Sequence, residues 1–203
     1  MLRQRGLAGS VATMRPMDAS GVPLPWMSYP FIDYISGLDL SDCRLFEFGS
    51  GSSTRYWATR CREVLAVEND RGWYDKISSG MPPNARVVFG ATESEYLGAI
   101  DSGKPYDIVV IDGAMNRRLM AEKALPNLKP DGFVVLDNSD VWVKAAETLR
   151  TGGLIQVDLN GFAPAAQFEQ TTSLFLAPGF RPKLRGRHLP AKTPWCMRHV
   201  IED

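Results

Sequence analysis

The chain has 203 residues, enough for one domain with a substantial hydrophobic core. Its 23 Lys and Arg residues balance its 23 Asp and Glu residues, so no excess of positive charge indicates a nucleic-acid partner. No apolar run approaches the length of a membrane span, and the cysteines, Cys43, Cys61 and Cys196, lack paired metal-ligand spacing. We therefore expect a cytoplasmic protein with free thiols and no membrane partner, whose oligomeric state stays open, a homodimer included.

The first segment differs in composition from the rest. Residues 1–25 carry Gly, Ser, Pro and apolar residues without a period, which predicts an arm that is mobile unless a partner orders it. Ser28 as an N-cap and Pro30 in the first turn then predict a helix. Trp26 and Tyr29 at its start either cover a bound ligand or pack on the domain, and both interpretations stay open.

A glycine loop follows the next apolar run. Residues 44–48 predict a short buried strand, and the run from Gly49 to Thr54 predicts a loop that enters a helix. Its glycines let a ligand approach the main chain, while the hydroxyl side chains from Ser52 onward can cap the helix. The following strand ends in Glu68, where a carboxylate can accept both hydroxyls of a ribose. Strand, glycine loop, helix, strand and acid together predict half of a nucleoside site.

Two residues bear on which nucleoside this is. Thr54 stands where a dinucleotide fingerprint requires Gly or Ala, and no Gly-Lys-Ser/Thr of a phosphate loop follows. Glu47 places a carboxylate where it would repel a pyrophosphate but could hold a cationic group such as an amino-acid ammonium. These residues disfavour a nicotinamide dinucleotide, but they do not identify the nucleoside that the site binds.

The sequence Glu-Phe-Gly-Ser-Gly-Ser-Ser at residues 47–53, with Glu68 downstream, resembles motif I and the ribose acid of class I S-adenosylmethionine-dependent methyltransferases. The resemblance implies S-adenosyl-L-methionine as the cofactor. The cofactor-binding residues that it implies are Glu47, Gly49, Ser50, Gly51, Ser53, Glu68, Asn69, Glu93 and Asp112. Glu93 either reaches the adenine or caps the helix that follows it.

Strand and helix signals alternate along the rest of the chain. We predict helices over residues 55–62, 71–79, 93–100, 115–125 and 141–150, and strands over residues 63–68, 85–89, 106–112, 133–138, 154–158 and 173–176. In the second helix, Trp73, Tyr74 and Ile77 have the spacing of core residues, and residues 130–132 are typical of a turn. The pattern predicts an α/β domain over residues 26–179 with a Rossmann-like, doubly wound sheet that is mostly parallel. The resemblance implies seven strands with an antiparallel last strand.

Two segments could contact an acceptor. Residues 160–172 predict a loop long enough to form a substrate wall. Residues 180–203 form a basic tail with six Lys or Arg against two acids. Such a tail usually lies solvated on the surface, but it could also close over the site and meet an acidic substrate.

Polar side chains end two neighbouring strands of the predicted sheet. Asp112 ends one, and Asp137 with Asn138 ends the next, so two carboxylates and an amide oxygen converge and could hold a divalent cation such as Mg²⁺. The pattern partly resembles metal-dependent O-methyltransferases of the catechol and caffeoyl-coenzyme A type. Capping of the following helix by Ser139 or Asp140 explains the same residues without a metal, and both interpretations stay open.

The resemblance implies methyl transfer to a hydroxyl of a small-molecule or sugar acceptor. Asp112, Asp137 and Lys144 are the candidate catalytic residues, with Lys144 as the candidate base. Alternatives on the same fold are an aminopropyltransferase, a nicotinamide-dependent oxidoreductase and a non-catalytic nucleoside-binding module.

Overall fold

The computed structural model describes residues 5–103, 105–166 and 168–186. The α-helices are α1 (Leu7–Thr13), α2 (Tyr29–Ser36), α3 (Ser52–Ala58), α4 (Arg71–Ser78), α5 (Glu93–Gly98), α6 (Arg117–Ala124) and α7 (Val143–Thr151). The strands are β1 (Arg44–Phe48), β2 (Glu63–Glu68), β3 (Ala85–Phe89), β4 (Tyr106–Ile111), β5 (Leu128–Leu136), β6 (Ile155–Phe162) and β7 (Glu169–Leu176). Short 3₁₀ turns, Ala99–Ser102 and Leu125–Asn127, follow α5 and α6.

The strands form one seven-stranded sheet in the order β3-β2-β1-β4-β5-β7-β6. Strands β1 to β5 are parallel, and β7 runs antiparallel to both of its neighbours, β5 and β6. The inner strands are almost continuously apolar because helices cover both of their faces. The predicted doubly wound, mostly parallel sheet with an antiparallel strand near its end is confirmed.

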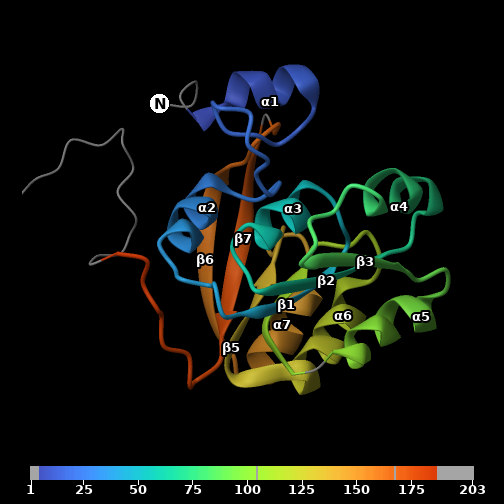
Figure 1. Cartoon of the computed structure of the whole chain (residues 1–203). Helices are drawn as coiled ribbons and strands as arrows, with labels where there is room; N and C mark the ends of the chain where they lie inside the picture. The colour runs from blue at the N-terminus through green and yellow to red at the C-terminus, as the bar shows by residue number, and fades with distance from the viewer. Residues whose placement is uncertain (1–4, 104, 167, 187–203) are drawn as a thin grey trace, which may run out of the picture.

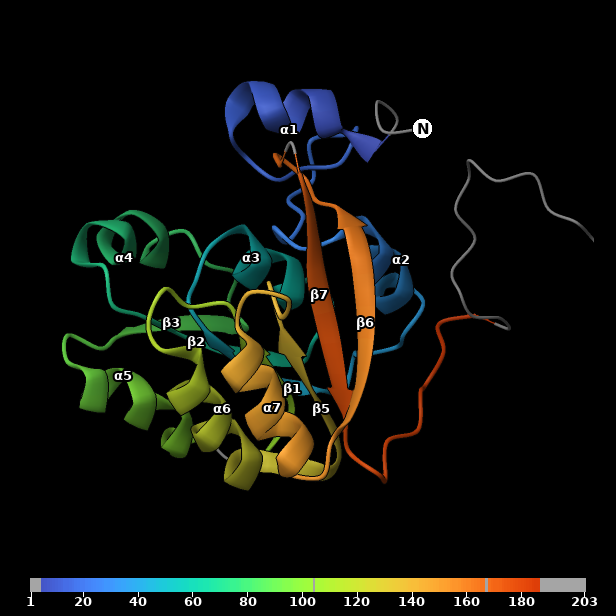
Figure 2. The ribbon, with the colours of Figure 1, turned by 180° about the vertical axis from the view of Figure 1, so that it is seen from behind.

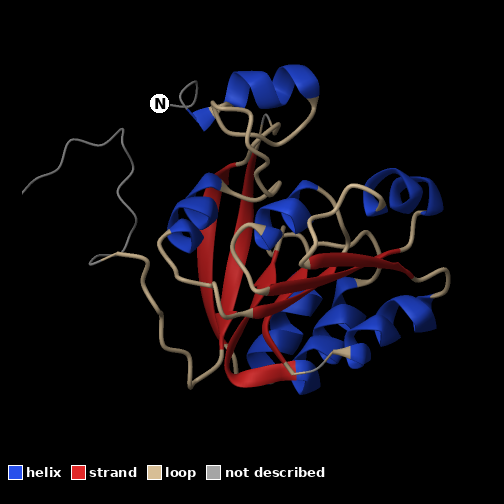
Figure 3. Cartoon of the chain, viewed as in Figure 1, coloured by secondary structure: helices blue, strands red, loops and turns tan. Residues whose placement is uncertain are grey.

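Helices form a layer on each side of this sheet (Figures 1 and 3). On one face, α2 and α3 pack on the sheet through side chains such as Phe31, Ile35 and Trp57. On the other face, α5, α6 and α7 supply Tyr96, Met120 and others. None of the helices in the described residues is long and apolar enough to cross a membrane.

The predicted wall loop over residues 160–172 is wrong, because β6 and β7 continue through most of it. The two strands pair from Ile155↔Leu176 to Phe162↔Glu169, which leaves residues 163–168 as the connection. Side chains on β6 are mostly exposed or half-buried, so polar residues such as Asn160 belong to a solvent-facing strand without an apolar signal. The two strands extend beyond the rest of the sheet toward α1 (Figures 1 and 2).

The predicted turn at residues 130–132 is also wrong, because it lies inside β5. A register irregularity between Tyr106 and Ile108 in the pairing of β4 with β5 accommodates it. A Cβ atom at Gly132 would lie 2.6 Å from the carbonyl oxygen of Asp107. Close backbone approach, rather than a chain reversal, therefore accounts for this glycine.

The N-terminal arm contains helix α1 and lies against the domain. Arg5 forms a bidentate ion pair with Asp33 of α2, with N–O distances of 2.9 and 2.8 Å, and its guanidinium also lies over the ring of Tyr29. Within the arm, the Ser10 hydroxyl donates to the carbonyl of Met17 at 2.8 Å. These contacts identify what would hold the arm in place; its mobility stays a prediction.

The basic tail is described only as far as residue 186. Lys183 pairs with Asp39 and Asp42, in the segment that leads into β1. The start of the tail therefore lies at the edge of the sheet where β1 begins. Residues 187–203, with Cys196, lie outside the described residues, while Cys43 and Cys61 are free thiols.

Candidate functional site

The site lies at the edge of the sheet where the parallel strands end. The backbone ladder continues one residue beyond β1, β4 and β5: the N–H groups of Gly49, Asp112 and Asp137 donate to carbonyls of neighbouring strands at 2.9, 3.1 and 3.2 Å. These bonds hold the three loops side by side. Ligands of doubly wound sheets bind at this edge.

Gly49 makes the turn out of β1 in a conformation that other residues rarely adopt. Its φ is +96°, and a Cβ atom there would lie 3.2 Å from the Cα and N atoms of Gly113. Gly51 is different, because its φ of 161° is extended and a Cβ atom would meet only the ring of Trp73, at 3.8 Å. The first glycine is thus required by the fold, and the second leaves space beside Trp73.

Glu47 is buried beneath the loop. Its Oε2 accepts a 2.5 Å hydrogen bond from the Thr54 hydroxyl, which in turn accepts the N–H of Gly51 at 2.9 Å. Among the described residues, its Oε1 has no hydrogen-bond partner although it is buried. Burial raises the pKa of this carboxyl to about 8, against the opposing effect of the nearby Ser53 and Thr54 hydroxyls.

Glu68 ends β2 beside the same loop. Its Oε2 accepts the Ser50 hydroxyl at 2.7 Å, and its Oε1 accepts the backbone N–H groups of Asn69 and Asp70 at 2.9 and 2.8 Å. The carboxylate is thus fixed in orientation. A carboxylate has about four lone-pair sites, so it can still accept hydroxyl groups.

Trp73 was predicted to pack in the core, and that prediction is wrong. The side chain is 40% exposed, and its Nε1 donates to the carbonyl of Ser50 at 2.9 Å. Helical spacing gave the wrong face because α4 packs on the sheet chiefly through Ile77. The indole instead braces the glycine loop.

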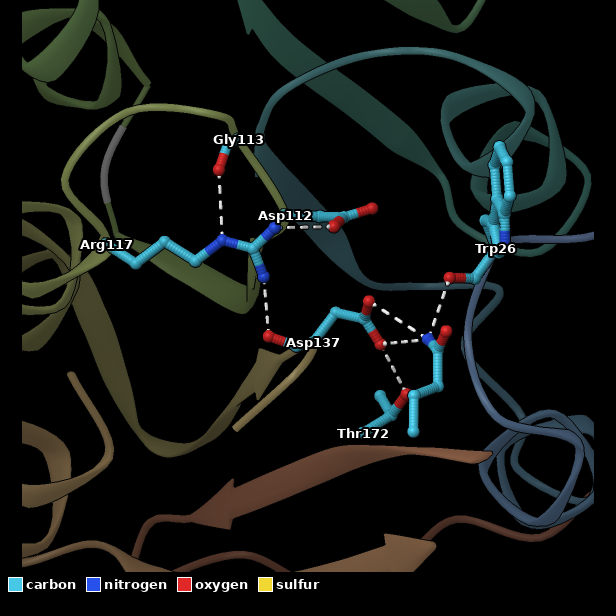
Figure 4. A network of polar contacts seen from close by, with 7 residues as sticks. Trp26, Asp112, Gly113, Arg117, Asp137 and Thr172 are labelled. Atoms are coloured by element: carbon cyan, nitrogen blue, oxygen red, sulfur yellow. Dashed lines mark hydrogen bonds and ion pairs between the residues drawn. The ribbon is translucent and has the colours of Figure 1, made fainter. Parts of the chain in front are cut away.

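Arg117, in the first turn of α6, joins the ends of β4 and β5 (Figure 4). Its Nε donates to the carbonyl of Gly113 at 2.9 Å, one terminal nitrogen contacts Asp112 Oδ1 at 3.1 Å, and the other donates to the carbonyl of Asp137. The residue is only 6% exposed. A single buried cation therefore fixes both strand ends.

The Asp137 carboxylate faces away from Arg117, toward β7 and the arm (Figure 4). Its oxygens accept hydrogen bonds from the Thr172 hydroxyl and from the Gln170 amide, at 3.0 and 3.1 Å for the latter. The same amide also donates to the carbonyl of Trp26 at 3.2 Å. Contacts thus run from the end of β4 to Trp26, directly after the arm.

The two aspartates differ in their surroundings. Burial raises the pKa of Asp112 to about 6, although Arg117 opposes the shift. Burial and the charge of Asp112 raise the pKa of Asp137, against the hydrogen bonds from its neighbours. Asp112 keeps some solvent access, whereas Asp137 is 3% exposed.

The proposed metal ligands do not fit a divalent cation in this arrangement. The Arg117 guanidinium lies 3.1 Å from Asp112, where its charge would oppose that of a metal. The Asp137 oxygens are directed at neutral donors on β7. The described residues contain no group of three or more His, Cys, Asp or Glu that could hold a metal ion.

The remaining candidates lie around this centre. Asn138 has a φ of +51°, and its carbonyl accepts the N–H groups of residues 141 and 142, just before α7. The start of α7 has no side-chain cap, so the predicted capping by Ser139 or Asp140 is wrong. Lys144 is exposed on α7 and makes none of the described contacts to the aspartates. Glu93 is exposed in the first turn of α5, where Thr92 provides the cap, and its contact with an adenine stays a prediction.

A cavity of about 540 Å³ opens beside the glycine loop. Its wall contains four of the predicted site residues: Ser50, Gly51, Ser53 and Asp112. Other parts of the wall come from the arm (parts of residues 14–23), from Trp26 directly after it, and from α4. Tyr29 is buried and packs on the domain. Trp26 lines this cavity and is 40% exposed, and its contact with a ligand stays a prediction.

Sequence reasoning missed several contributors. Gln170 and Thr172 fell in the expected loop, and only their alternation within a strand could have indicated that both face Asp137. Tyr96 is buried with its hydroxyl unpartnered in the described structure, and a Cβ atom at Gly113 would lie 2.1 Å from that hydroxyl. Its helical position gave no signal beyond core packing.

Solved structures share this architecture. The cofactor-bound Rv0187 from MTB is 19% identical with a TM-score of 0.59, over 87% of this chain and 90% of that one. The precorrin-6y C5,15-methyltransferase from Geobacter metallireducens GS-15 is 16% identical with a TM-score of 0.56, over 73% and 86% of the two chains. This chain has the class I methyltransferase fold.

The N-methyltransferase NodS from Bradyrhizobium japonicum WM9 is 14% identical with a TM-score of 0.55, over 73% of this chain and 92% of that one. No protein-family model and no curated protein sequence matches the chain. By their names, the precorrin enzyme and NodS methylate carbon and nitrogen, respectively. The fold therefore does not specify the acceptor atom.

We predict that alanine destabilises the protein at Gly49 but not at Gly51, the two glycines of the loop. Gly49→Ala should lower the free energy of unfolding by about 1–2 kcal/mol or more, because a positive φ is strained for alanine and its methyl would press on Gly113. Gly51→Ala should keep wild-type stability, because its extended backbone suits alanine. Urea denaturation of both variants tests this, and equal losses of stability would contradict it.

We predict that Glu47→Gln stabilises the ligand-free protein at neutral and higher pH. The folded pKa of about 8 lies above the ordinary glutamate pKa of about 4.5, so the contribution of Glu47 to stability is lost as pH rises between these values. Glutamine does not titrate, and the stability difference between the two proteins should therefore grow from about pH 5 to about pH 8.

Thermal unfolding at several pH values measures this difference. Glu147→Gln, at an exposed position on α7, is the matched control and should track the wild type. If the stability difference between Glu47→Gln and the wild type does not change with pH, the pKa of Glu47 is not raised by burial and the prediction is contradicted.

Proposed function

We propose that this chain transfers the methyl group of S-adenosylmethionine to a hydroxyl group of a small-molecule or sugar acceptor. The observation that carries the proposal is the unpartnered, buried Oε1 of Glu47, two residues before the turn at Gly49 in a class I methyltransferase fold. Burying such an atom is costly unless a ligand completes it. A cationic group suits it best, because that group would also stabilise the ionised carboxylate.

The chain's residues fit this cofactor from both ends. Glu47 would pair with the ammonium group of the methionine part through its unpartnered Oε1. Glu68, fixed by Ser50 and two backbone N–H groups, would accept the ribose hydroxyls. Gly51, which has no side chain and leaves space beside Trp73, would let the cofactor approach the main chain of the loop. When bound, S-adenosylmethionine supplies a methyl group on a sulfonium, which is a good leaving group.

Asp112 is the residue that we assign to the acceptor. Its Oδ1 is held by Arg117, it lines the cavity, and its raised pKa makes it a better proton acceptor than an ordinary aspartate. In this proposal it orients the acceptor hydroxyl and accepts its proton as the oxygen–methyl bond forms. Placement of the acceptor oxygen in line with the methyl group contributes the larger share of catalysis.

The same cavity argues against the rival reactions. An aminopropyltransferase should line its acceptor site with several acids for a polyamine, but Asp112 is the one acid among the described residues of this lining. A dinucleotide would meet the Glu47 carboxylate, and Thr54 is buried and hydrogen-bonded at the position where close packing calls for glycine. Both features favour a sulfonium nucleoside.

A calorimetric titration with S-adenosylmethionine tests the cofactor. We expect micromolar binding, ~−8 kcal/mol, and no binding of NAD. Glu68→Gln should weaken binding about tenfold or more because it removes an acceptor for the ribose. Glu63→Gln, at the other end of β2, should bind as the wild type does. Absence of binding to the wild-type protein would refute the proposal.

We predict that the cofactor complex gains nothing from a divalent metal. The guanidinium of Arg117 already supplies positive charge beside Asp112, so Mg²⁺ should find no favourable site there. Thermal unfolding of the complex with MgCl₂ or with NaCl at equal ionic strength should give the same midpoint. A midpoint raised by Mg²⁺ and restored by a chelator would contradict this arrangement.

A further inference from the structure

The cavity beside the glycine loop has an uneven distribution of charge. Arg15 from the arm, Arg55 from α3 and Lys76 from α4 contribute to its wall. Asp112 is the one acid in this lining, and its charge already faces Arg117. The cavity wall is therefore basic although the whole chain has no net charge.

The same wall exposes large apolar side chains. Met14 is 61% exposed, and Trp26 and Trp73 are each 40% exposed. They come from the arm, from the residue directly after it, and from α4, and all three line one cavity. Exposed apolar side chains that gather in a concave site indicate a ligand with an apolar or planar part.

The carboxylates assigned to the cofactor, Glu47 and Glu68, do not line this cavity. The loop between them, residues 50–53, does so, as does Asp112. The part of the wall that contains Met14, Arg15 and Trp26 has none of the residues assigned to the cofactor. This part suits the acceptor rather than the cofactor.

We propose that the acceptor is an anion: a planar or apolar hydroxyl compound that carries a carboxylate or phosphate group. This inference rests on the proposed function and specifies its acceptor. The tryptophans contact the body of the acceptor, and Arg15 and Lys76 contact its anionic group. Lys76 lies 5.0 Å from the centre of the Trp73 ring, so an anion paired with it would place an attached planar body beside that indole.

The test uses probes that share a para-hydroxyphenyl group and differ in charge. They are para-hydroxybenzoate, para-hydroxyphenyl phosphate, the neutral para-hydroxybenzamide and the cationic para-hydroxybenzylamine. Their affinities for the full chain are measured by calorimetry, with and without S-adenosylhomocysteine. We expect at least one anion to bind about fivefold or more tightly than the amide, and the amine to bind most weakly. Comparison of the two anions distinguishes carboxylate from phosphate.

Variants identify the source of the preference. The double variant Arg15→Gln, Lys76→Gln should lose the preference for the anion and keep its affinity for S-adenosylhomocysteine. The matched control is Arg118→Gln, Lys123→Gln, which removes two cations from α6 outside the cavity and should keep the preference.

Several results would overturn the inference. Equal affinity for all probes, or no binding of any probe while S-adenosylhomocysteine binds normally, would exclude an anionic acceptor of this class. A double variant that loses cofactor affinity instead would assign the cations to the cofactor. Failure of S-adenosylhomocysteine itself to bind would refute the proposed function, and it is measured separately from the charge preference.

Discussion

The hydrogen bonds of Arg117 determine how the edge of the sheet is assembled. One guanidinium contacts the carbonyl of Gly113, the carboxylate of Asp112 and the carbonyl of Asp137, which lie on two neighbouring strand ends. Its planar group has five N–H donors in fixed directions, so a lysine could not make the same set of contacts. Because the residue is buried, loss of the cation would leave Asp112 without its partner, at a cost of about 3–5 kcal/mol. The geometry of the site depends on this one side chain.

Through Asp137, the hydrogen bonds around Arg117 connect to the segment between the arm and α2. Gln170 donates both to the Asp137 carboxylate and to the carbonyl of Trp26, so the end of β5 and the cavity wall share one amide. Ser28 adds a second link, since its N–H donates to the Thr172 hydroxyl at 3.0 Å. Trp26, which lines the cavity, is therefore held from two sides by contacts with β7: directly through Gln170 and by way of nearby Ser28.

Local patterns predicted the parts of this protein that local physics determines. The buried strands, the glycine turn and the helix capped by Ser28 follow from apolar runs, dihedral freedom and capping chemistry, and the structure has them. Parts of β6 and β7 were missed because β6 is exposed or half-buried and the first half of β7 is polar, so neither part has an apolar signal. The site was predicted as strand ends that meet, but which partner each side chain takes depends on distant segments: Asp137 binds Gln170 and Thr172, 33 and 35 residues away. Spacing alone could not indicate the Arg117 guanidinium beside Asp112, because that contact is apparent only in three dimensions.

In the proposed function, the buried Glu47 carboxyl favours a positively charged ligand. Its Oε1 has no partner in the described structure, and its raised pKa means that ionisation is costly at this position. A glutamine would remove that cost but could not balance a positive charge. The acid therefore lowers the stability of the fold. It would strengthen the binding of a cation, because the ion pair forms in a medium of low dielectric constant. Below the folded pKa, the arriving cation must also displace a proton from this carboxyl. Under the proposed function, cofactor affinity should consequently rise with pH up to about 8, in the same range over which ionisation of Glu47 lowers the stability of the fold.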